Sequence, residues 1–123
     1  MSSEYFGKAV RDKIPDIIRD SGSECSVEVL NELLFYVAMK KKLQEEVDEY
    51  KKTPCLEELA DIMEVVYKLC EMEGFSIKEL ERVRLKKREE RGGFDRSLYL
   101  KEIVNTQSGI CRCERSDFIY ESD

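Results

Sequence analysis

Hydrophobic residues recur at helical spacing along the middle of this chain, and the first long stretch of that pattern follows Asn31. Asparagine is a favoured N-cap, and the pattern predicts a helix from there to about Lys52. The apolar side chains of this helix share one stripe: Tyr36, Met39, Leu43, Val47 and Tyr50.

A second long helix is predicted from Pro54 to about Glu73, after the break at Thr53-Pro54. Thr53 is expected to cap it, with proline at the first helical position and Gly74 ending it. The arc of its apolar residues is too wide for a surface helix, so we expect burial on two sides, one of them against a second subunit. The apolar set is Leu56, Leu59, Ala60, Ile62, Met63, Val65, Val66, Tyr67, Leu69 and Cys70.

Two shorter helices are predicted on either side of this pair. Pro15 suits the first turn of a helix that runs to about Ser21 and is ended by Gly22. Ser76-x-x-Glu79 is a capping box that opens a helix ending at Gly92-Gly93.

The predicted fold class is mainly α: an antiparallel helical hairpin or bundle with a small two-strand β element, in an oligomeric assembly. Residues 25–30 and 97–103 are the candidate strands, and they could pair with each other. The predicted domain spans residues 1–104. The polar, non-periodic residues 105–123 are expected to form a mobile C-terminal tail.

Composition excludes several classes of protein. Hydrophobic residues make up 41% of the 123 positions, which suits one domain with a core and argues against global disorder. No apolar run approaches the roughly 20 residues of a membrane span, and no signal peptide is visible, so a cytoplasmic protein is expected. The net charge of −6 argues against a broad surface for nucleic acid.

The chain contains no histidine, which removes the commonest general base and the commonest transition-metal ligand. Five cysteines are scattered along it, and only Cys111 and Cys113 form a close pair, so reduced thiols are favoured over a zinc site. Any hydrolytic chemistry must therefore use carboxylates, lysines, arginines or thiols.

Paired carboxylates occur on both long helices. Glu46 and Glu49 are three residues apart and therefore neighbours on one helical face, and so are Glu58 and Asp61. If the chain folds back at residues 53–54, Glu49 and Glu58 lie about equally far from the turn. Glu46 and Asp61 lie equally far again, one helical turn deeper. Four facing carboxylates repel one another unless a cation lies between them, and oxygen ligands of this kind suit Mg²⁺ or Mn²⁺.

The positions on the helical wheel also favour a partner for these carboxylates. Glu46 falls beside the apolar stripe of the first long helix and Glu58 within the apolar arc of the second, where an unpaired carboxylate is costly. There is a plain alternative, since charged residues make up 39% of the chain and such pairs usually lie on a solvated helix face. The same stretches also contain rival pairs. These are Glu45 with Asp48, and Asp61 with Glu64.

A metal-bound polyphosphate also needs cations at its outer oxygens. Two basic groups could supply them, although cations at a helix C-terminus are also favoured by the helix dipole. The groups are Lys8, Arg11 and Lys13, and Lys86, Lys87, Arg88 and Arg91.

Four segments stand in a recognisable order: Val10–Pro15, Lys42–Glu49, Glu57–Val65 and Lys86–Phe94. Together they resemble small MazG-like proteins of the all-α nucleoside triphosphate pyrophosphohydrolases, related to phosphoribosyl-ATP pyrophosphohydrolase and dimeric dUTPases. The resemblance covers about residues 6–103, in order and in register. The spacer between Glu49 and Glu58 is shorter than is typical of that family.

The resemblance implies roles for particular residues. The family's Mg²⁺ motif falls on Glu46, Glu49, Glu58 and Asp61. It further implies that Glu45 holds or activates the attacking water and that Lys87 and Arg91 approach the phosphates. For Arg11 and Lys13 the resemblance implies a role without defining it, and we expect both to contribute to substrate binding. A homodimer or higher homo-oligomer is also implied.

The predicted activity is Mg²⁺-dependent hydrolysis of a nucleoside triphosphate to the monophosphate and pyrophosphate, with removal of non-standard nucleotides as one role. Phosphoribosyl-ATP and dUTP are alternative substrates. A helical interaction module that docks a basic partner, or a nucleotide sensor that does not cleave, is the alternative of another class.

Overall fold

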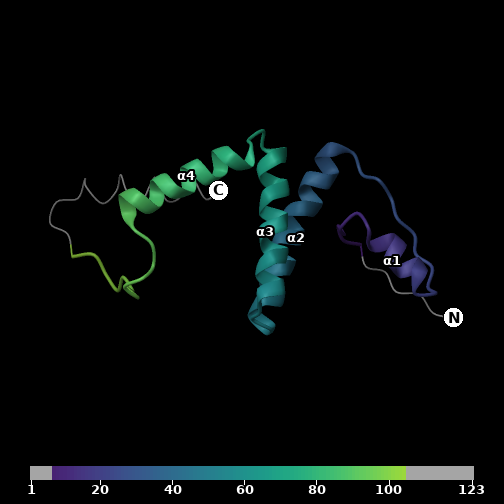
Figure 1. Ribbon diagram of the computed structural model, residues 1–123, viewed down its shortest axis with the longest axis horizontal. Helices are drawn as coiled ribbons and strands as arrows, with labels where there is room; N and C mark the ends of the chain where they lie inside the picture. The colour runs from purple at the N-terminus through teal and green to yellow at the C-terminus, as the bar shows by residue number, and fades with distance from the viewer. Residues whose placement is uncertain (1–6, 105–123) are drawn as a thin grey trace. The chain divides into compact units, whose positions relative to one another are not determined.

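The computed structural model describes residues 7–104, and four α-helices follow one another in this part of the chain (Figure 1). The chain divides into two units, Met1–Glu90 and Arg91–Asp123. The helices are α1 (Ile14–Asp20), α2 (Glu32–Lys52), α3 (Leu56–Met72) and α4 (Ile77–Arg91).

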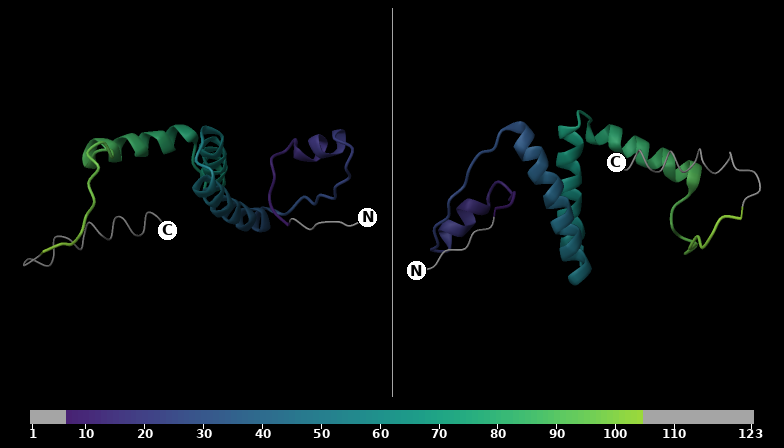
Figure 2. Two further views of the ribbon diagram at one scale, coloured as in Figure 1. Left: turned by 90° about the horizontal axis from the view of Figure 1, so that it is seen from below. Right: turned by 180° about the vertical axis from the view of Figure 1, so that it is seen from behind.

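Helices α2 and α3 form an antiparallel hairpin. Among the described helices, these two pack against one another. Both views of Figure 2 show them side by side. Asn31 caps α2 as predicted, because its side-chain oxygen accepts a hydrogen bond from the Leu34 backbone N–H at 2.8 Å. At the same end of the hairpin, the Tyr36 hydroxyl donates to Glu73 Oε2 at 2.5 Å and so links the start of α2 to the end of α3.

The ends of α3 and α4 follow local chemistry. Gly74, which follows the C-cap Glu73 of α3, has a φ of +94°, a conformation that favours glycine. The predicted capping box is present: Glu79 N–H donates to Ser76 Oγ at 3.0 Å, and Ser76 N–H donates to Glu79 Oε1 at 2.8 Å. These contacts confirm the predicted start of α4.

Two local predictions are wrong. Thr53 does not cap α3; it is the C-cap of α2, where its N–H donates to the Glu49 carbonyl at 3.0 Å. Cys55 is the N-cap of α3 instead, with an extended backbone. Residues 25–30 and 97–103 form no strand, and the described residues contain none, so the small β element is absent from this part of the chain.

The core of the described residues is small, and its apolar members are Met39 of α2 with Val65 and Cys70 of α3. Much of the apolar arc of α3 is exposed, so α2 covers only one of the two sides expected to be buried. Its exposed members include Leu56, Leu59 and Met63, which are 79%, 44% and 45% accessible.

None of the described helices combines the length and the apolar composition needed to cross a membrane. Cys25, Cys55 and Cys70 carry free thiols. Cys111, Cys113 and the predicted mobile tail over 105–123 lie outside the described residues.

Candidate metal centre

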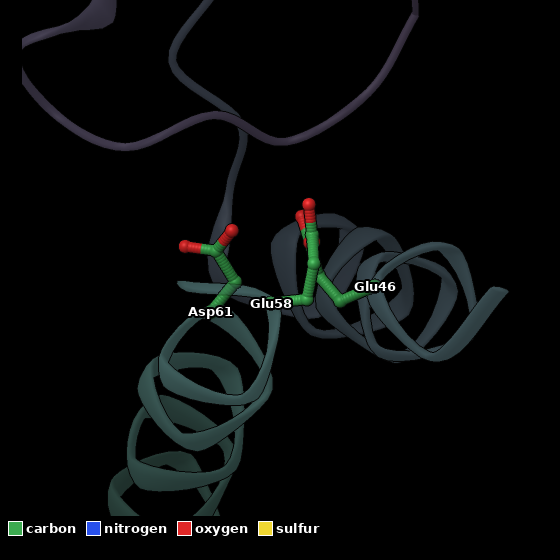
Figure 3. Close-up of side chains that lie close together, drawn as sticks. All are labelled: Glu46, Glu58 and Asp61. Atoms are coloured by element: carbon green, nitrogen blue, oxygen red, sulfur yellow. The ribbon is translucent and has the colours of Figure 1, made fainter. Parts of the chain in front are cut away.

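Three carboxylates meet at the α2–α3 hairpin. Oxygens of Glu46, Glu58 and Asp61 all lie within 4.8 Å of one another, and no other group of three potential ligands is this close among residues 7–104. Figure 3 shows Glu46 reaching from one helix and Glu58 with Asp61 from the other, with the carboxylates turned to the same side. We call these three residues the acidic cluster.

Among the described residues, Glu46 is the charged residue that is buried, with 8% of its surface accessible. Burial of a carboxylate is costly without a countercharge. Lys42 supplies one, because its Nζ lies 3.1 Å from Glu46 Oε2 and 3.6 Å from Glu45 Oε1. Lys42 was not among the predicted site residues. Its position four residues before Glu46 was the available signal, since residues at this spacing are neighbours on a helix.

The environment of Glu58 opposes its ionisation. Loss of hydration raises the pKa of this carboxyl above its usual value of 4.5, and the charges of Asp61, Glu46 and Glu49 raise it further. A proton or a divalent cation would relieve this repulsion.

The structure separates the predicted ligands from their rivals. Asp48 and Glu64 are exposed and lie outside the acidic cluster, and Asp48 instead accepts a hydrogen bond from Gln44 at 3.0 Å. Glu49 is also exposed and outside the cluster, although its charge acts on Glu58. Three of the four predicted ligands are therefore brought together.

Two cations of the N-terminal segment contact this region. Arg11 Nη2 lies 2.6 Å from Asp61 Oδ1, and Lys8 Nζ lies 2.9 Å from Glu45 Oε2. Hydrogen bonding to Glu45 raises the pKa of Lys8, against a smaller opposing effect of burial, so its charge is held. Glu45 thus lies between two lysines, directly before Glu46 of the acidic cluster.

The other predicted cations are placed differently. Lys13 is the residue that precedes α1; its side chain is exposed, and no ion pair of residues 7–104 includes it. Lys87 and Arg91 belong to α4, whereas the helix packing of the described residues joins α2 to α3. Their expected role at the phosphates stays a prediction.

The donor set fits Mg²⁺ or Mn²⁺ in its chemistry. Both ions prefer carboxylate oxygens. The cluster offers one oxygen from each of three carboxylates, all within 4.8 Å of one another. Three carboxylates would leave coordination positions for water and for phosphate oxygens, as is common for Mg²⁺.

Fold and site together define a mainly helical protein with an acidic cluster on a helical hairpin. Comparison with protein-family models, with curated proteins and with solved structures finds no match to this chain. The likeness to the MazG-like pyrophosphohydrolases therefore stays a resemblance carried by the four segments of the sequence.

Proposed function

We propose that this protein hydrolyses a nucleoside triphosphate to the monophosphate and pyrophosphate, with Mg²⁺ (or Mn²⁺) bound at Glu46, Glu58 and Asp61. The observation that carries the proposal is the meeting of these three carboxylate oxygens from two helices within 4.8 Å. The burial of Glu46 and the raised pKa of Glu58 support it, because both favour a cation among the carboxylates.

A bound Mg²⁺ supplies charge neutralisation at the phosphates and lowers the pKa of a coordinated water. In the hydrolysis, the oxygen of the attacking water would form a bond to the α-phosphorus while the bond from this phosphorus to the α–β bridging oxygen breaks. The released proton needs an acceptor, and Glu45 is our candidate for receiving it or for orienting the water. Lys8 Nζ lies 2.9 Å from Glu45 Oε2, and Lys42 Nζ lies 3.6 Å from Glu45 Oε1. These two contacts hold Glu45 beside the acidic cluster.

We assign phosphate binding to four basic residues, of which Arg11 is the one that contacts the acidic cluster. Charge-assisted hydrogen bonds to phosphate oxygens would stabilise the negative charge that develops on the departing pyrophosphate. The four residues are Arg11, Lys13, Lys87 and Arg91. Glu49 is assigned to a further position around the metal, because its charge already acts on Glu58.

We also propose a homo-oligomer, in the cytoplasm, where nucleoside triphosphates are abundant. The support is the exposed apolar arc of α3, which includes Leu56, Leu59 and Met63. Apolar stripes of this kind on a helix are usually covered in the working assembly. A second copy of α3 would supply the second buried side that the sequence predicts.

Phosphoribosyl-ATP and dUTP remain alternative substrates, since no described residue marks the recognition of a base. Two alternatives of another class are a module that docks a basic partner on the acidic cluster and a sensor that binds a nucleotide without cleaving it. The ion pairs formed by Lys8 and Arg11 give the docking alternative a specific basis, because they show that cationic side chains can occupy the carboxylates.

The test is product analysis by anion-exchange chromatography after incubation with standard and modified nucleoside triphosphates, dUTP and phosphoribosyl-ATP, with and without Mg²⁺. Monophosphate and pyrophosphate should form only when metal is present. Diphosphate and orthophosphate would show that a different bond is cleaved. Binding without product would favour the sensor, and neither binding nor product would favour the docking module.

Matched variants locate the activity. Glu58→Gln and Asp61→Asn remove one charge each from the acidic cluster and should abolish turnover. Glu64→Gln and Asp48→Asn remove charges from the exposed rival positions and should leave turnover close to that of the wild type. Equal activity in all four variants would contradict the proposed metal centre.

A further inference from the structure

The N-terminal segment of residues 7–13 has no helix or strand, yet it reaches the carboxylates of the hairpin through two side chains. Arg11 contacts Asp61, 50 residues later in the chain, and Lys8 contacts Glu45, 37 residues later. We call residues 7–13 the cationic strap.

Three basic side chains contact the carboxylates in and beside the acidic cluster. Lys8 and Lys42 contact Glu45, Lys42 also contacts Glu46, and Arg11 contacts Asp61. Three cations are thus in direct contact with three carboxylates, and Glu58 adds a fourth negative charge. A divalent cation that binds Asp61 has to displace Arg11 from that carboxylate, and the most exposed cations are the easiest to release.

The two strap contacts differ from that of Lys42 in exposure. The side chains of Arg11 and Lys8 are 53% and 41% accessible, whereas that of Lys42 is 15% accessible. Ion pairs as exposed as those of the strap contribute little to stability, because water and salt screen them. Lys42 is fixed within α2, while the strap can leave without unfolding a helix.

We propose that the cationic strap is held at the acidic cluster in the metal-free protein, through Arg11 on Asp61 and through Lys8 on the neighbouring Glu45, and that binding of a divalent cation releases it. This inference rests on the proposed metal centre. Arg11 and the metal compete for Asp61, so the strap weakens metal binding until a cation is present in excess. Once released, Arg11 and Lys8 are free to meet the phosphates of an incoming nucleotide, which carry the opposite charge.

Two measurements on the full chain test the strap without relying on turnover. The first is Mn²⁺ affinity, measured by electron paramagnetic resonance of free Mn²⁺ at low salt. Arg11→Gln should bind Mn²⁺ about two- to fivefold more tightly than the wild type, the range expected for loss of one exposed ion pair. Arg84→Gln is the matched control, because it breaks a comparable exposed pair with Glu81 at 2.7 Å on α4.

The second measurement is the rate of trypsin cleavage after Lys8 and Arg11. Trypsin must take the basic side chain into its own pocket, so release of the strap should make cleavage faster when Mn²⁺ is added. Glu58→Gln, which weakens the metal centre, controls for effects of Mn²⁺ on the protease and should show no acceleration.

The outcomes separate the strap from the proposed function. The strap is supported if Arg11→Gln binds Mn²⁺ more tightly than the wild type, Arg84→Gln does not, and added Mn²⁺ accelerates trypsin cleavage of the wild type after Lys8 and Arg11. Equal affinities, or cleavage that Mn²⁺ does not change, overturn the strap and leave the metal centre standing. No Mn²⁺ binding by the wild type or by Arg11→Gln overturns both.

Discussion

Lys42 Nζ lies 3.1 Å from Glu46 Oε2, four residues further along α2, and both side chains are largely shielded from water. The contact gives the buried carboxylate a countercharge from its own helix, so the site can form before any metal binds. The same lysine reaches Glu45 at 3.6 Å and therefore also fixes the neighbouring acid.

Replacing Lys42 by Met should destabilise the metal-free protein. The substitution keeps an unbranched apolar stem but leaves the buried Glu46 charge without its partner. Leaving a buried polar group unsatisfied costs about 1–3 kcal/mol, and the cost is larger for a charged group. Urea unfolding with a chelator present measures this loss. Mg²⁺ should restore more stability to Lys42→Met than to the wild type, because the ion replaces the missing charge.

The double variant Lys42→Met/Glu46→Gln is the control for that experiment. Removal of both charges should recover much of the stability lost in Lys42→Met. A single variant as stable as the wild type would show that the contact contributes nothing to the fold.

Glu58→Gln should stabilise the metal-free protein at pH 7. A carboxyl whose pKa is raised by folding binds its proton more tightly in the folded state, so stability is lost as the pH rises through the interval between 4.5 and the raised pKa. Above that interval, ionised Glu58 repels Asp61 and Glu46, and glutamine removes this repulsion. Thermal unfolding with a chelator should give the variant the higher melting temperature at pH 7.

The same experiment at pH 4 supplies the control for Glu58. The wild-type carboxyl is then largely protonated in both states, so the difference between variant and wild type should shrink. A variant that melts lower than the wild type at pH 7 would contradict the repulsion inferred at the acidic cluster.

Mg²⁺ should raise the stability of the wild type through binding to the folded state. At 10 to 100 times the dissociation constant, one bound ion contributes about 1.4–2.7 kcal/mol to the free energy of unfolding. Asp61→Asn should lose this gain, and Glu64→Gln, an exposed substitution three residues further along α3, should keep it. Denaturant unfolding over a series of Mg²⁺ concentrations measures the effect. An equal gain in both variants would place the bound ion away from the cluster.

The ends of the helices could be predicted because they depend on a few neighbouring residues. Asn31 bonds to Leu34, and Ser76 exchanges hydrogen bonds with Glu79, all within four positions of the chain. Thr53 shows the limit of this approach. The following proline disfavours helical backbone at Thr53, so this residue could either end α2 or begin α3. In the structure it ends α2 as the C-cap.

Features that depend on distant residues were harder to predict. Residues 25–30 have a strand-like pattern but no partner strand among the described residues, and a single strand gains no ladder of hydrogen bonds. At the site, spacing selected four carboxylates, but the rotation of α2 against α3 decides which oxygens meet. That rotation brings Glu46 into the acidic cluster and leaves Glu49 exposed.

Glu45→Gln should separate metal binding from catalysis. Glu45 precedes the buried Glu46 and is held by Lys8 and Lys42, but its oxygens are not part of the acidic cluster. If it receives the proton of the attacking water, glutamine should lower kcat by about 10²–10⁴-fold, the usual contribution of a general base. Mn²⁺ affinity should stay within a few-fold of the wild type, because the three ligands remain. Asp48→Asn, three residues further along α2, is the matched substitution and should leave kcat nearly unchanged. A loss of Mn²⁺ binding in Glu45→Gln would instead make Glu45 a ligand, and unchanged kcat would leave proton acceptance to another group.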